Sequence, residues 1–482
     1  MARPKRLDLQ IYHCTCVEPL QKSSPKSLPV PHCSPPSTAR SGGEVAAKRT
    51  NLSPSGADAG EDRLSALPDD ILVLILLRLR TIAAAARTCV LSRRWRRIWT
   101  LLPELTFYLA PDYHHIREVL AAPEAPALRR IFVVTKDDAP NSVAVWLPLA
   151  ARRLSGVLQY GNLQEEHEEE EEVVVDGAIP LPCLGNATAI VLDLGYSALT
   201  LPSSCTFTRL TELHLERVRF QGTCELGHIV SSLQCPCLRK LHIRQVRGVA
   251  KLTVHSESLL EMELWRLYGL QQLNIDAPVL NKLALRRCFV QNQEQAIANI
   301  SAPQLLSLTW IDAYDPSYVH LGSLGQLQQL RPDLIVVYGN HHSGRNHEVL
   351  WLLQRFQVIH SLGIALGYPQ LSPHSFFCVI TPSKRTFFSY ISMWWAKSAR
   401  ISEHNMVNVG FDSYQIKEDI GNFQYLMEDM TLLPHATFLT LYVMNKGHGF
   451  GASSFHVLRL CTGIIKLSLV LRPTCDSKGS LM

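Results

Sequence analysis

The chain has 482 residues, of which 46% are apolar and 18% charged, and its formal net charge at pH 7 is +5. This composition predicts a folded chain and excludes a largely disordered one, while the length favours several structural units or a repeat array. A charge this small on so long a chain does not indicate nucleic acid as a partner.

The sequence shows neither a secretory signal nor a membrane-spanning segment. It begins with basic and then polar residues, and its most apolar segment, Ile71 to Leu77, is too short to cross a bilayer. We therefore expect no membrane partner and a location in the nucleus, the cytoplasm or both. In such a compartment the 13 cysteines are expected to be reduced thiols.

Residues 1–60 differ in composition from the rest of the chain. They are rich in proline, serine, lysine and glycine, as in the phrase Ser34-Pro35-Pro36-Ser37. Such a segment has too little apolar surface to form a core, so we predict a disordered arm.

Three short helices are predicted after this arm. The stretch from Leu67 to Asp70 begins the first, with a proline in the first turn and acidic residues at the positive end of the dipole. Thr81 is predicted to cap a second helix, Ile82 to Val90, and Ser92 to cap a third, Arg93 to about Thr100. Because the first helix is apolar on nearly every side, the unit is expected to bind a partner.

From residue 108 to residue 365 the sequence carries short units of the form Leu-x-Leu. Successive units lie about 21 to 28 residues apart, which is the period of leucine-rich repeats. The clear units are Thr211–Leu215, Arg239–Ile243, Leu260–Leu264, Asn281–Leu285 and Leu306–Trp310, and weaker units between them are Lys251–Val254 and Gln272–Ile275. Each unit predicts a strand that stacks on its neighbours in a solenoid. The asparagine of regular repeats is missing, so we expect irregular turns.

The remaining segments are less regular. Residues 366–422 have no clear period and are predicted to be an aperiodic insert. Residues 423–472 are expected to be ordered, with a strand at Phe438 to Val443, a helix near Ser454 to Leu460 and a last strand at Ile465 to Leu471. The acidic run Glu165 to Glu172 is interpreted as a solvated loop, with contact to a basic partner as the alternative.

The predicted helices and repeats together resemble a known family. The residues that carry the resemblance are Asp62-Arg63-Leu64-Ser65, Leu67-Pro68-Asp69, Leu72, Ile75-Leu76, Leu79, Arg87-Thr88, Val90 to Trp95, Trp99, Leu102-Pro103 and Phe107. In this order they are similar to the F-box of plant F-box/leucine-rich-repeat proteins, and His448 to Leu469 is similar to the C-terminal (FBD) region of that group. The resemblance implies an α/β chain, with a three-helix F-box at 61–107, an irregular leucine-rich-repeat solenoid at 108–365 and an FBD-like segment at 423–472.

The resemblance also implies a function. Such a protein is a non-catalytic substrate receptor of an SCF-type ubiquitin ligase: its F-box binds a Skp-type adaptor, and through it a cullin–RING ligase, while its repeats bind a target protein for ubiquitination and proteasomal degradation. Carried over by motif position, the expected adaptor-binding residues are Leu67, Pro68, Ile71, Leu72, Ile75, Leu79, Leu91, Ser92, Arg94 and Trp95. No cofactor, metal or catalytic residue is implied, and the target is not identified. Two departures from the family are Arg80, where proline is usual, and a shortened C-terminal region.

Two other functions remain as alternatives. The four arginines and two tryptophans between Leu91 and Trp99 suggest contact with nucleic acid, although Trp95 and Trp99 also fit one packed face of a helix. The other alternative is a degenerate F-box protein without a functional substrate domain, because residues 366–422 interrupt the repeats.

Clusters of residues that suggest other chemistry have the wrong spacing. His13-Cys14-Thr15-Cys16 does not match a zinc site, and the histidines at 341–347 contain no His-Glu-x-x-His. Gly447 to Gly451 lacks the lysine of a phosphate-binding loop. Cys235-Pro236-Cys237 is predicted to be a turn with buried thiols.

Overall fold

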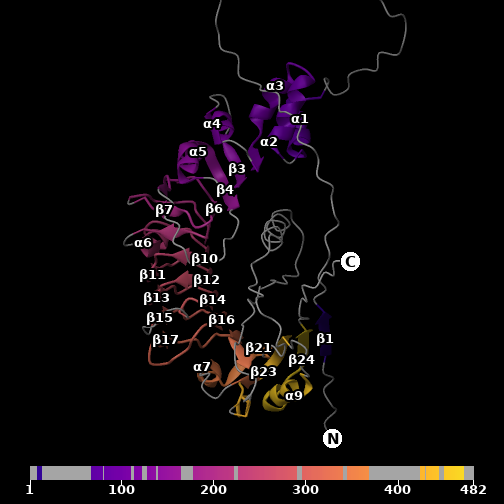
Figure 1. The fold of residues 1–482 in the computed structure, drawn as a ribbon, viewed down its shortest axis with the longest axis vertical. Coiled ribbons are helices and arrows are strands. Elements are labelled where there is room, and N and C mark those ends of the chain that lie inside the picture. The colour runs from indigo at the N-terminus through magenta and orange to yellow at the C-terminus, as the bar shows by residue number, and fades with distance from the viewer. Residues whose placement is uncertain are drawn as a thin grey trace, which may run out of the picture.

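A computed structural model describes most of the chain. The described residues are 8–13, 67–79, 81–109, 113–121, 127–136, 139–163, 177–202, 204–221, 226–289, 296–339, 345–368, 424–428, 430–444 and 450–471. They form a curved stack of repeats with short helices at one end (Figure 1). The acidic run, Arg80 and all but the first three residues of the predicted insert lie outside the described residues.

Short helical segments build the first of these units. They are α1 (Asp69–Leu77), α2 (Ile82–Arg87), η1 (Thr88–Val90), α3 (Trp95–Ile98) and η2 (Trp99–Leu101), where η marks a 3-10 helix. Their small core consists of Leu72, Leu76, Ile82, Ala85, Trp95 and Ile98. The predicted second helix is thus an α-helix followed by a single 3-10 turn.

The two predicted capping residues have different outcomes. Thr81 is confirmed, because its hydroxyl oxygen accepts the backbone N–H of Ala84 at 3.2 Å. The prediction that Ser92 caps the third helix is wrong: α3 begins at Trp95 and has no side-chain cap. A capping residue needs an extended backbone, whereas Arg94 before this helix already has helical angles (φ −65°, ψ −45°). The chain therefore turns into α3 without an extended residue in front of it.

Two helix–strand units connect the helical region to the repeats. Strand β2 (Glu104–Tyr108) pairs in parallel with β3 (Leu128–Lys136), and β3 pairs in parallel with β4 (Leu154–Leu163). Parallel neighbours require crossover connections, which α4 (Tyr113–Ala121) and α5 (Pro140–Arg153) provide. One face of α5 is buried at helical spacing: Val143, Trp146, Leu147 and Ala150.

The clear Leu-x-Leu units form one parallel sheet, which confirms their prediction. Its central strands are β6 (Ala189–Asp193), β8 (Glu212–Glu216), β10 (Lys240–Arg247), β12 (Glu261–Tyr268), β14 (Lys282–Arg286) and β16 (Ser307–Ile311). They pair in this order with their leucines in register, so that Leu241 lies beside Leu213 and Met262. We call this the main sheet. It follows the inner side of the curve in Figure 1.

Shorter strands complete each repeat. β5 (Ala178–Pro180), β7 (Ala198–Thr200) and β9 (Arg219–Phe220) follow the first repeats. A separate four-stranded sheet contains β11 (Lys251–His255), β13 (Gln272–Asp276), β15 (Ile297–Ser301) and β17 (Val319–Leu321), and with α6 (Leu226–Val230) it lies on the outer side of the curve (Figure 1). The weaker units of the sequence are therefore strands of a second sheet.

A polar ladder crosses this outer sheet. Asn299 donates to the side-chain oxygen of Asn274 at 2.9 Å, and Asn274 donates to the Thr253 hydroxyl at 3.4 Å. These residues occupy one register row, and their neighbours along each strand are buried. The ladder thus links successive turns of the solenoid outside its apolar core.

The main sheet continues beyond β16 to the C-terminal end of the described chain. Its further elements, with the helices and short strands beside them, are β18 (Gln329–Pro332), β19 (Leu334–Val336), β20 (Tyr338–Gly339), α7 (Arg345–Gln354), β21 (Val358–Gly367), β22 (Gln424–Tyr425), β23 (His435–Met444), α9 (Gly451–Leu460) and β24 (Lys466–Leu471). The strands and helix predicted in residues 423–472 are confirmed as β23, α9 and β24. Strand β21 extends through Gly367, two residues into the segment predicted to be an insert.

The predicted disordered arm contains a strand. β1 (Asp8–His13) pairs in parallel with β24, from Asp8 opposite Lys466 to His13 opposite Leu471. The prediction of disorder is therefore wrong for these residues. The outer edge of β24 presents a row of backbone N–H and C=O groups that an extended segment can pair with, whatever its composition. Figure 1 shows β1 beside β24.

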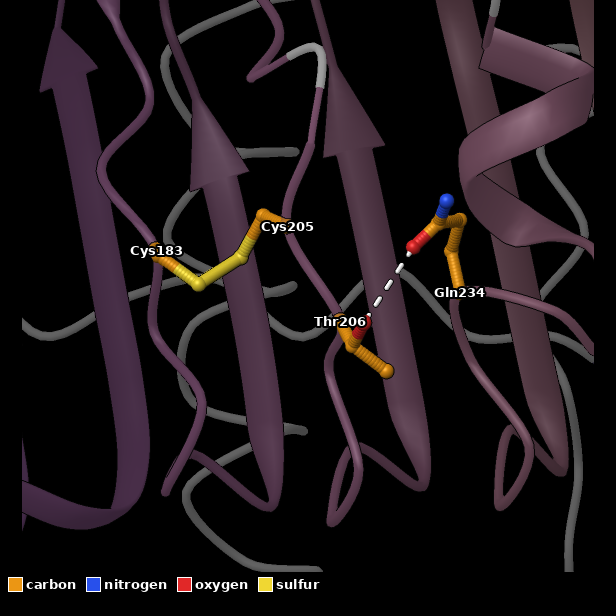
Figure 2. The surroundings of a disulfide bond; sticks show 4 residues. All are labelled: Cys183, Cys205, Thr206 and Gln234. Atoms are coloured by element: carbon orange, nitrogen blue, oxygen red, sulfur yellow. Dashed lines mark hydrogen bonds between the residues drawn. A yellow bond between two sulfur atoms is a disulfide. The ribbon is translucent and has the colours of Figure 1, made fainter.

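The cysteines also differ from the prediction. Cys183 and Cys205 form a disulfide between two neighbouring loops (Figure 2), so the expectation that all cysteines are reduced thiols is wrong for this pair. Among the described residues, the cysteines that are not disulfide-bonded are Cys89, Cys235, Cys237, Cys288 and Cys461. The turn at Cys235 to Cys237 buries one thiol and exposes the other, whereas the sequence predicted two buried thiols.

Candidate functional site

The helical region leaves large apolar side chains exposed. The exposed fraction is 40% for Ile71, 56% for Leu74, 79% for Val90 and 59% for Leu91. Ile71 and Leu74 lie on one face of α1, whereas Val90 and Leu91 lie at the end of η1 and directly after it. A unit this small cannot bury all of its apolar surface, and such exposure marks a site for a protein partner. We call these four residues the apolar face.

An arginine joins the start of α1 to the turn before α3. Arg94 donates from Nε to an Asp69 carboxylate oxygen at 2.7 Å and from Nη2 to the Leu67 carbonyl at 2.6 Å. Because the ion pair is partly exposed, its contribution to stability is small, on the order of 0–1 kcal/mol. Its effect is geometric: it fixes the segment that carries Leu91 relative to α1.

The ten predicted adaptor-binding residues fall into three environments. The exposed residues are Pro68, Ile71, Leu79 and Leu91; the half-buried residues are Leu67, Ile75, Ser92 and Arg94; the buried residues are Leu72 and Trp95. The structure therefore brings eight of the ten to the surface of the helical region.

The two buried residues lie beneath the predicted interface. Leu72 is 0% exposed and Trp95 is 4% exposed, so neither side chain is accessible to a partner in this structure. Leu72 and Leu76 are spaced four apart in α1 and face the core, which Trp95 also enters. Both residues therefore support the surface from below in this structure, and their predicted contact with the adaptor stays a prediction.

The sequence interpretation missed two exposed residues, Leu74 and Val90. Leu74 follows Ile71 by three positions, so helical spacing alone gave a signal that both share a face. Val90 lies in a short 3-10 turn, whose exposed side the apolar pattern does not specify.

The inner face of the main sheet is a second candidate surface. Its outward positions carry charged and polar side chains, such as Lys240 beside Glu212 at 3.2 Å and Arg244 beside Glu263 at 3.0 Å. His242 stacks on a histidine of the neighbouring strand β8, with ring centroids 4.2 Å apart. The alternation of buried and half-buried residues along each strand places these groups on one face. We call this the inner face.

Aromatic rings extend the inner face toward the C-terminal repeats. Trp265 has the guanidinium groups of Arg244 and Arg266 at 5.8 and 5.7 Å from its ring centroid. Arg331 lies over the ring of Tyr442 at 4.5 Å. Arginine beside an aromatic ring is a frequent arrangement at protein interfaces, because both bury area and keep a polar group.

A buried ion pair lies at the N-terminal end of the inner face. Arg217 donates to both carboxylate oxygens of Asp193, at 2.7 and 2.6 Å, and to the Asn162 carbonyl at 3.2 Å. Beside it, burial and then the charge of Asp193 raise the pKa of Glu216 to about 7. In the next strand, burial lowers the pKa of His242 to about 4. These ionisable groups therefore affect the stability of the fold as well as the charge of the inner face.

The described residues give no indication of metal chemistry. In these parts of the chain, no group of three or more histidine, cysteine or acidic side chains is arranged to hold a metal ion. Nor does any described helix have the length and apolar character needed to cross a membrane. Cys14, Cys16 and the residues from 445 to 449 lie outside the described residues.

Two protein-family models match the chain. The F-box domain matches residues 64–106, and a model described as "FBD-associated F-box protein At5g56370, LRR repeats" matches residues 153–323. The chain thus combines an F-box domain with leucine-rich repeats of the FBD-associated type. The apolar face lies within the first match and most of the inner face within the second.

The chain is also similar to plant proteins with this combination of domains. The putative F-box/FBD/LRR-repeat protein At4g03220 of Arabidopsis thaliana is 26% identical over 321 residues, which cover 64% of this chain and 62% of that protein. F-box/FBD/LRR-repeat protein At2g04230 of the same plant is 28% identical over 277 residues, which cover 50% of this chain and 59% of that protein. The matches therefore span about three fifths of the length of these two relatives. No solved structure matches the chain.

Proposed function

We propose that this protein is the substrate-recognition subunit of an SCF-type ubiquitin ligase, located in the nucleus, the cytoplasm or both. The observation that carries the proposal is the apolar face, which lies within the segment that matches the F-box domain. The protein supplies binding surfaces and no catalytic residue, and the rest of the ligase performs the chemistry.

The first surface binds a Skp-type adaptor. In a three-helix F-box made of α1, α2 and α3, Ile71, Leu74, Val90 and Leu91 become buried against the adaptor. Full burial of a large aliphatic side chain is worth about 1.5–3 kcal/mol, so four exposed aliphatic residues are enough to dominate such an interface. Pro68 and Arg94 lie at the rim.

The second surface binds the target protein. The inner face offers paired charges, stacked histidines and Trp265 rather than a continuous apolar patch, and a folded protein surface matches this mixture. Since the F-box and the repeats are separate surfaces, the adaptor and the target bind at the same time. This arrangement holds the target near the ligase.

The adaptor contact is tested with a pair of variants of equal exposure. Val90 and Leu233 are both 79% exposed, but Leu233 lies outside the F-box. In a pull-down with a purified Skp-type adaptor, Val90→Asp is expected to weaken binding of the full chain at least tenfold. Leu233→Asp is expected to bind like the unmodified chain. Equal binding by both variants would exclude the apolar face as the adaptor site.

The target contact is tested by affinity purification from the source tissue with the proteasome blocked. Trp265→Ala removes a ring from the inner face, and Trp351→Ala removes one that is 45% exposed on α7. Trp265→Ala is expected to lose the target proteins and keep the adaptor, whereas Trp351→Ala keeps both. Identical target sets for the two variants would contradict target binding at the inner face.

The same experiments distinguish the alternatives. A degenerate receptor without a functional substrate domain retains the adaptor and captures no target with any variant. A nucleic-acid-binding protein instead shows steeply salt-dependent binding to DNA or RNA.

A further inference from the structure

The register of the repeats brings two cysteines together. Cys183 lies between β5 and β6, and Cys205 lies between β7 and β8 (Figure 2). Because β5 pairs with β7 and β6 pairs with β8, the two connecting loops lie side by side. Their Cα atoms are 5.7 Å apart, which is within the range that disulfides require. The pair is therefore a consequence of the repeat architecture.

The two cysteines of this disulfide differ in solvent exposure. Cys183 is exposed, whereas Cys205 is only 4% exposed. The loop of Cys205 is held on its other side, since the Phe207 N–H donates to the Gln234 carbonyl at 2.7 Å and the Thr206 hydroxyl donates to the Gln234 side chain at 3.4 Å (Figure 2). A reagent in solution therefore reaches the disulfide from the Cys183 side.

The loop between α6 and β10 in the next repeat also contains cysteines, but these do not form a disulfide. Cys235 corresponds in position to Phe207. In each case the backbone carbonyl accepts the N–H of the residue three positions later, in the turn before the next strand of the main sheet. Cys235 is fully buried, and burial raises the pKa of its thiol to about 12, which makes it unreactive. Cys237 is exposed and free, and it provides a natural control.

We propose that Cys183 and Cys205 form a reversible redox-modification site that exchanges with low-molecular-weight thiols of the glutathione class. The proposal rests on the nuclear or cytoplasmic location proposed above, but not on the adaptor or the target. Intracellular disulfides are rare and, when present, are usually transient or redox-sensing. A cross-link with one exposed sulfur between two repeats has the access that such exchange needs.

The exchange proceeds in two balanced steps. A thiolate attacks the Cys183 sulfur, the disulfide breaks, and Cys205 leaves as a thiolate that takes up a proton, which gives a mixed disulfide at Cys183. A second thiolate then attacks the sulfur of the attached small molecule and releases the Cys183 thiolate. In sum, the protein disulfide gains two electrons and becomes two thiols, while two thiol molecules become one small-molecule disulfide. Oxidised glutathione drives the reverse reaction.

The cross-link also has a structural consequence. It closes a loop with a sequence separation of 22 residues, which includes β6 and β7 and ends before β8. Closure of a loop of this length restricts the unfolded chain and stabilises the folded one. We expect the oxidised protein to melt about 3–5 °C above the reduced protein. Amide hydrogens in β6 and β8 are expected to exchange faster after reduction.

The site of attack is tested by peptide-resolved mass spectrometry of the full chain incubated with oxidised glutathione. In Cys205→Ser, Cys183 is expected to gain one glutathionyl group, whereas in Cys183→Ser the buried Cys205 remains largely unmodified. The variant Cys237→Ser is expected to form the disulfide like the unmodified chain. Preferential modification of Cys205, or no disulfide in the oxidised full chain, would overturn the proposal.

Reversibility is tested by thermal melting and hydrogen exchange with and without reduced glutathione. The unmodified chain is expected to shift to the lower melting temperature on reduction, and Cys183→Ser is expected to melt at that temperature under both conditions. A disulfide that persists in reduced glutathione until the protein unfolds would show a permanent structural cross-link, which contradicts an exchanging site.

Discussion

The F-box and the repeats differ in how much of their apolar side chains they bury. The strands of the solenoid completely bury leucines that point into the core, such as Leu264 and Leu285, and carry charged and polar groups on the inner face. The F-box buries Leu72 and Leu76 but leaves Leu74 and Val90 in solvent. A repeat always has a neighbour to cover its apolar side, whereas a unit of a few short helices does not. The F-box therefore leaves several apolar side chains exposed within a few turns of helix, whereas the inward-facing leucines of the solenoid strands are covered by neighbouring repeats.

The largest expected effect is in the buried ion pair of the solenoid. Arg217→Met leaves the Asp193 carboxylate buried without its partner and is expected to destabilise the protein by about 3–5 kcal/mol. The double variant Asp193→Leu, Arg217→Met removes both charges and is expected to cost much less. Denaturant melts of the two variants check this difference. Equal losses would mean that packing, rather than the uncompensated charge, determines the cost.

A matched pair of leucines sharpens the comparison between the two regions. Leu264→Ala, in the solenoid core at 0% exposure, is expected to destabilise the protein by about 3 kcal/mol. Leu74→Ala, in the F-box at 56% exposure, is expected to change stability by less than about 0.5 kcal/mol. Thermal melts measure both variants. A large loss for Leu74→Ala would show that this residue packs within the fold and is not available to a partner.

The inner face is expected to respond to pH through Glu216. Its folded pKa of about 7 lies above that of an unfolded glutamate, about 4.3, so the folded state favours the protonated form. This contribution to stability is fully present below pH 4.3 and is lost as pH rises through 7. Unfolding measured between pH 5 and pH 8 is expected to show this loss, and Glu216→Gln is expected to flatten the curve. An unchanged pH dependence in that variant would assign it to another group.

His242 contributes with the opposite sign. Its folded pKa of about 4 lies below the ordinary value, so its contribution to stability is present above about pH 6.5 and is lost as pH falls toward 4. In the same unfolding measurements, His242→Gln is expected to remove this loss of stability at acidic pH and to retain the loss at higher pH that is due to Glu216.

A small, local effect is expected at a helix cap in the F-box. Thr81→Ala removes the bond to the Ala84 N–H and is expected to destabilise α2 by about 1 kcal/mol, whereas Thr81→Ser retains an accepting oxygen and is expected to cost less. Hydrogen exchange of α2 amides measures the local effect. Under the proposed function, adaptor affinity falls only slightly with either variant, because the apolar face stays in place.

Much of this architecture was predictable from local patterns. The repeated Leu-x-Leu units predicted the strands β8, β10, β12, β14 and β16, because a solenoid strand needs buried residues at alternate positions whatever its neighbours are. Thr81 was recognised as a cap because its bond spans three residues. The exposed part of the F-box was recognised in outline from a helix too apolar for its own unit.

Features that depend on distant residues were not predictable in this way. Leu72 and Trp95 matched the expected interface by motif position, but which face of a short helix is buried depends on how the helical segments pack. The strand β1 forms because β24 has an edge at the far end of the chain, and composition alone indicated disorder. The weaker Leu-x-Leu units form strands, but the pattern did not show that these strands belong to a second sheet. This depends on how the chain bends within each repeat.

The sequence by itself determined the succession of units, the F-box and then the repeats, because both depend on short-range periodicity and motif order. The tertiary structure decided which apolar side chains remain in solvent, which charges meet on the inner face and which cysteines become neighbours. The physical reason is register: parallel pairing of β5 with β7 and β6 with β8 brings Cys183 to Cys205, and no local pattern encodes that distance.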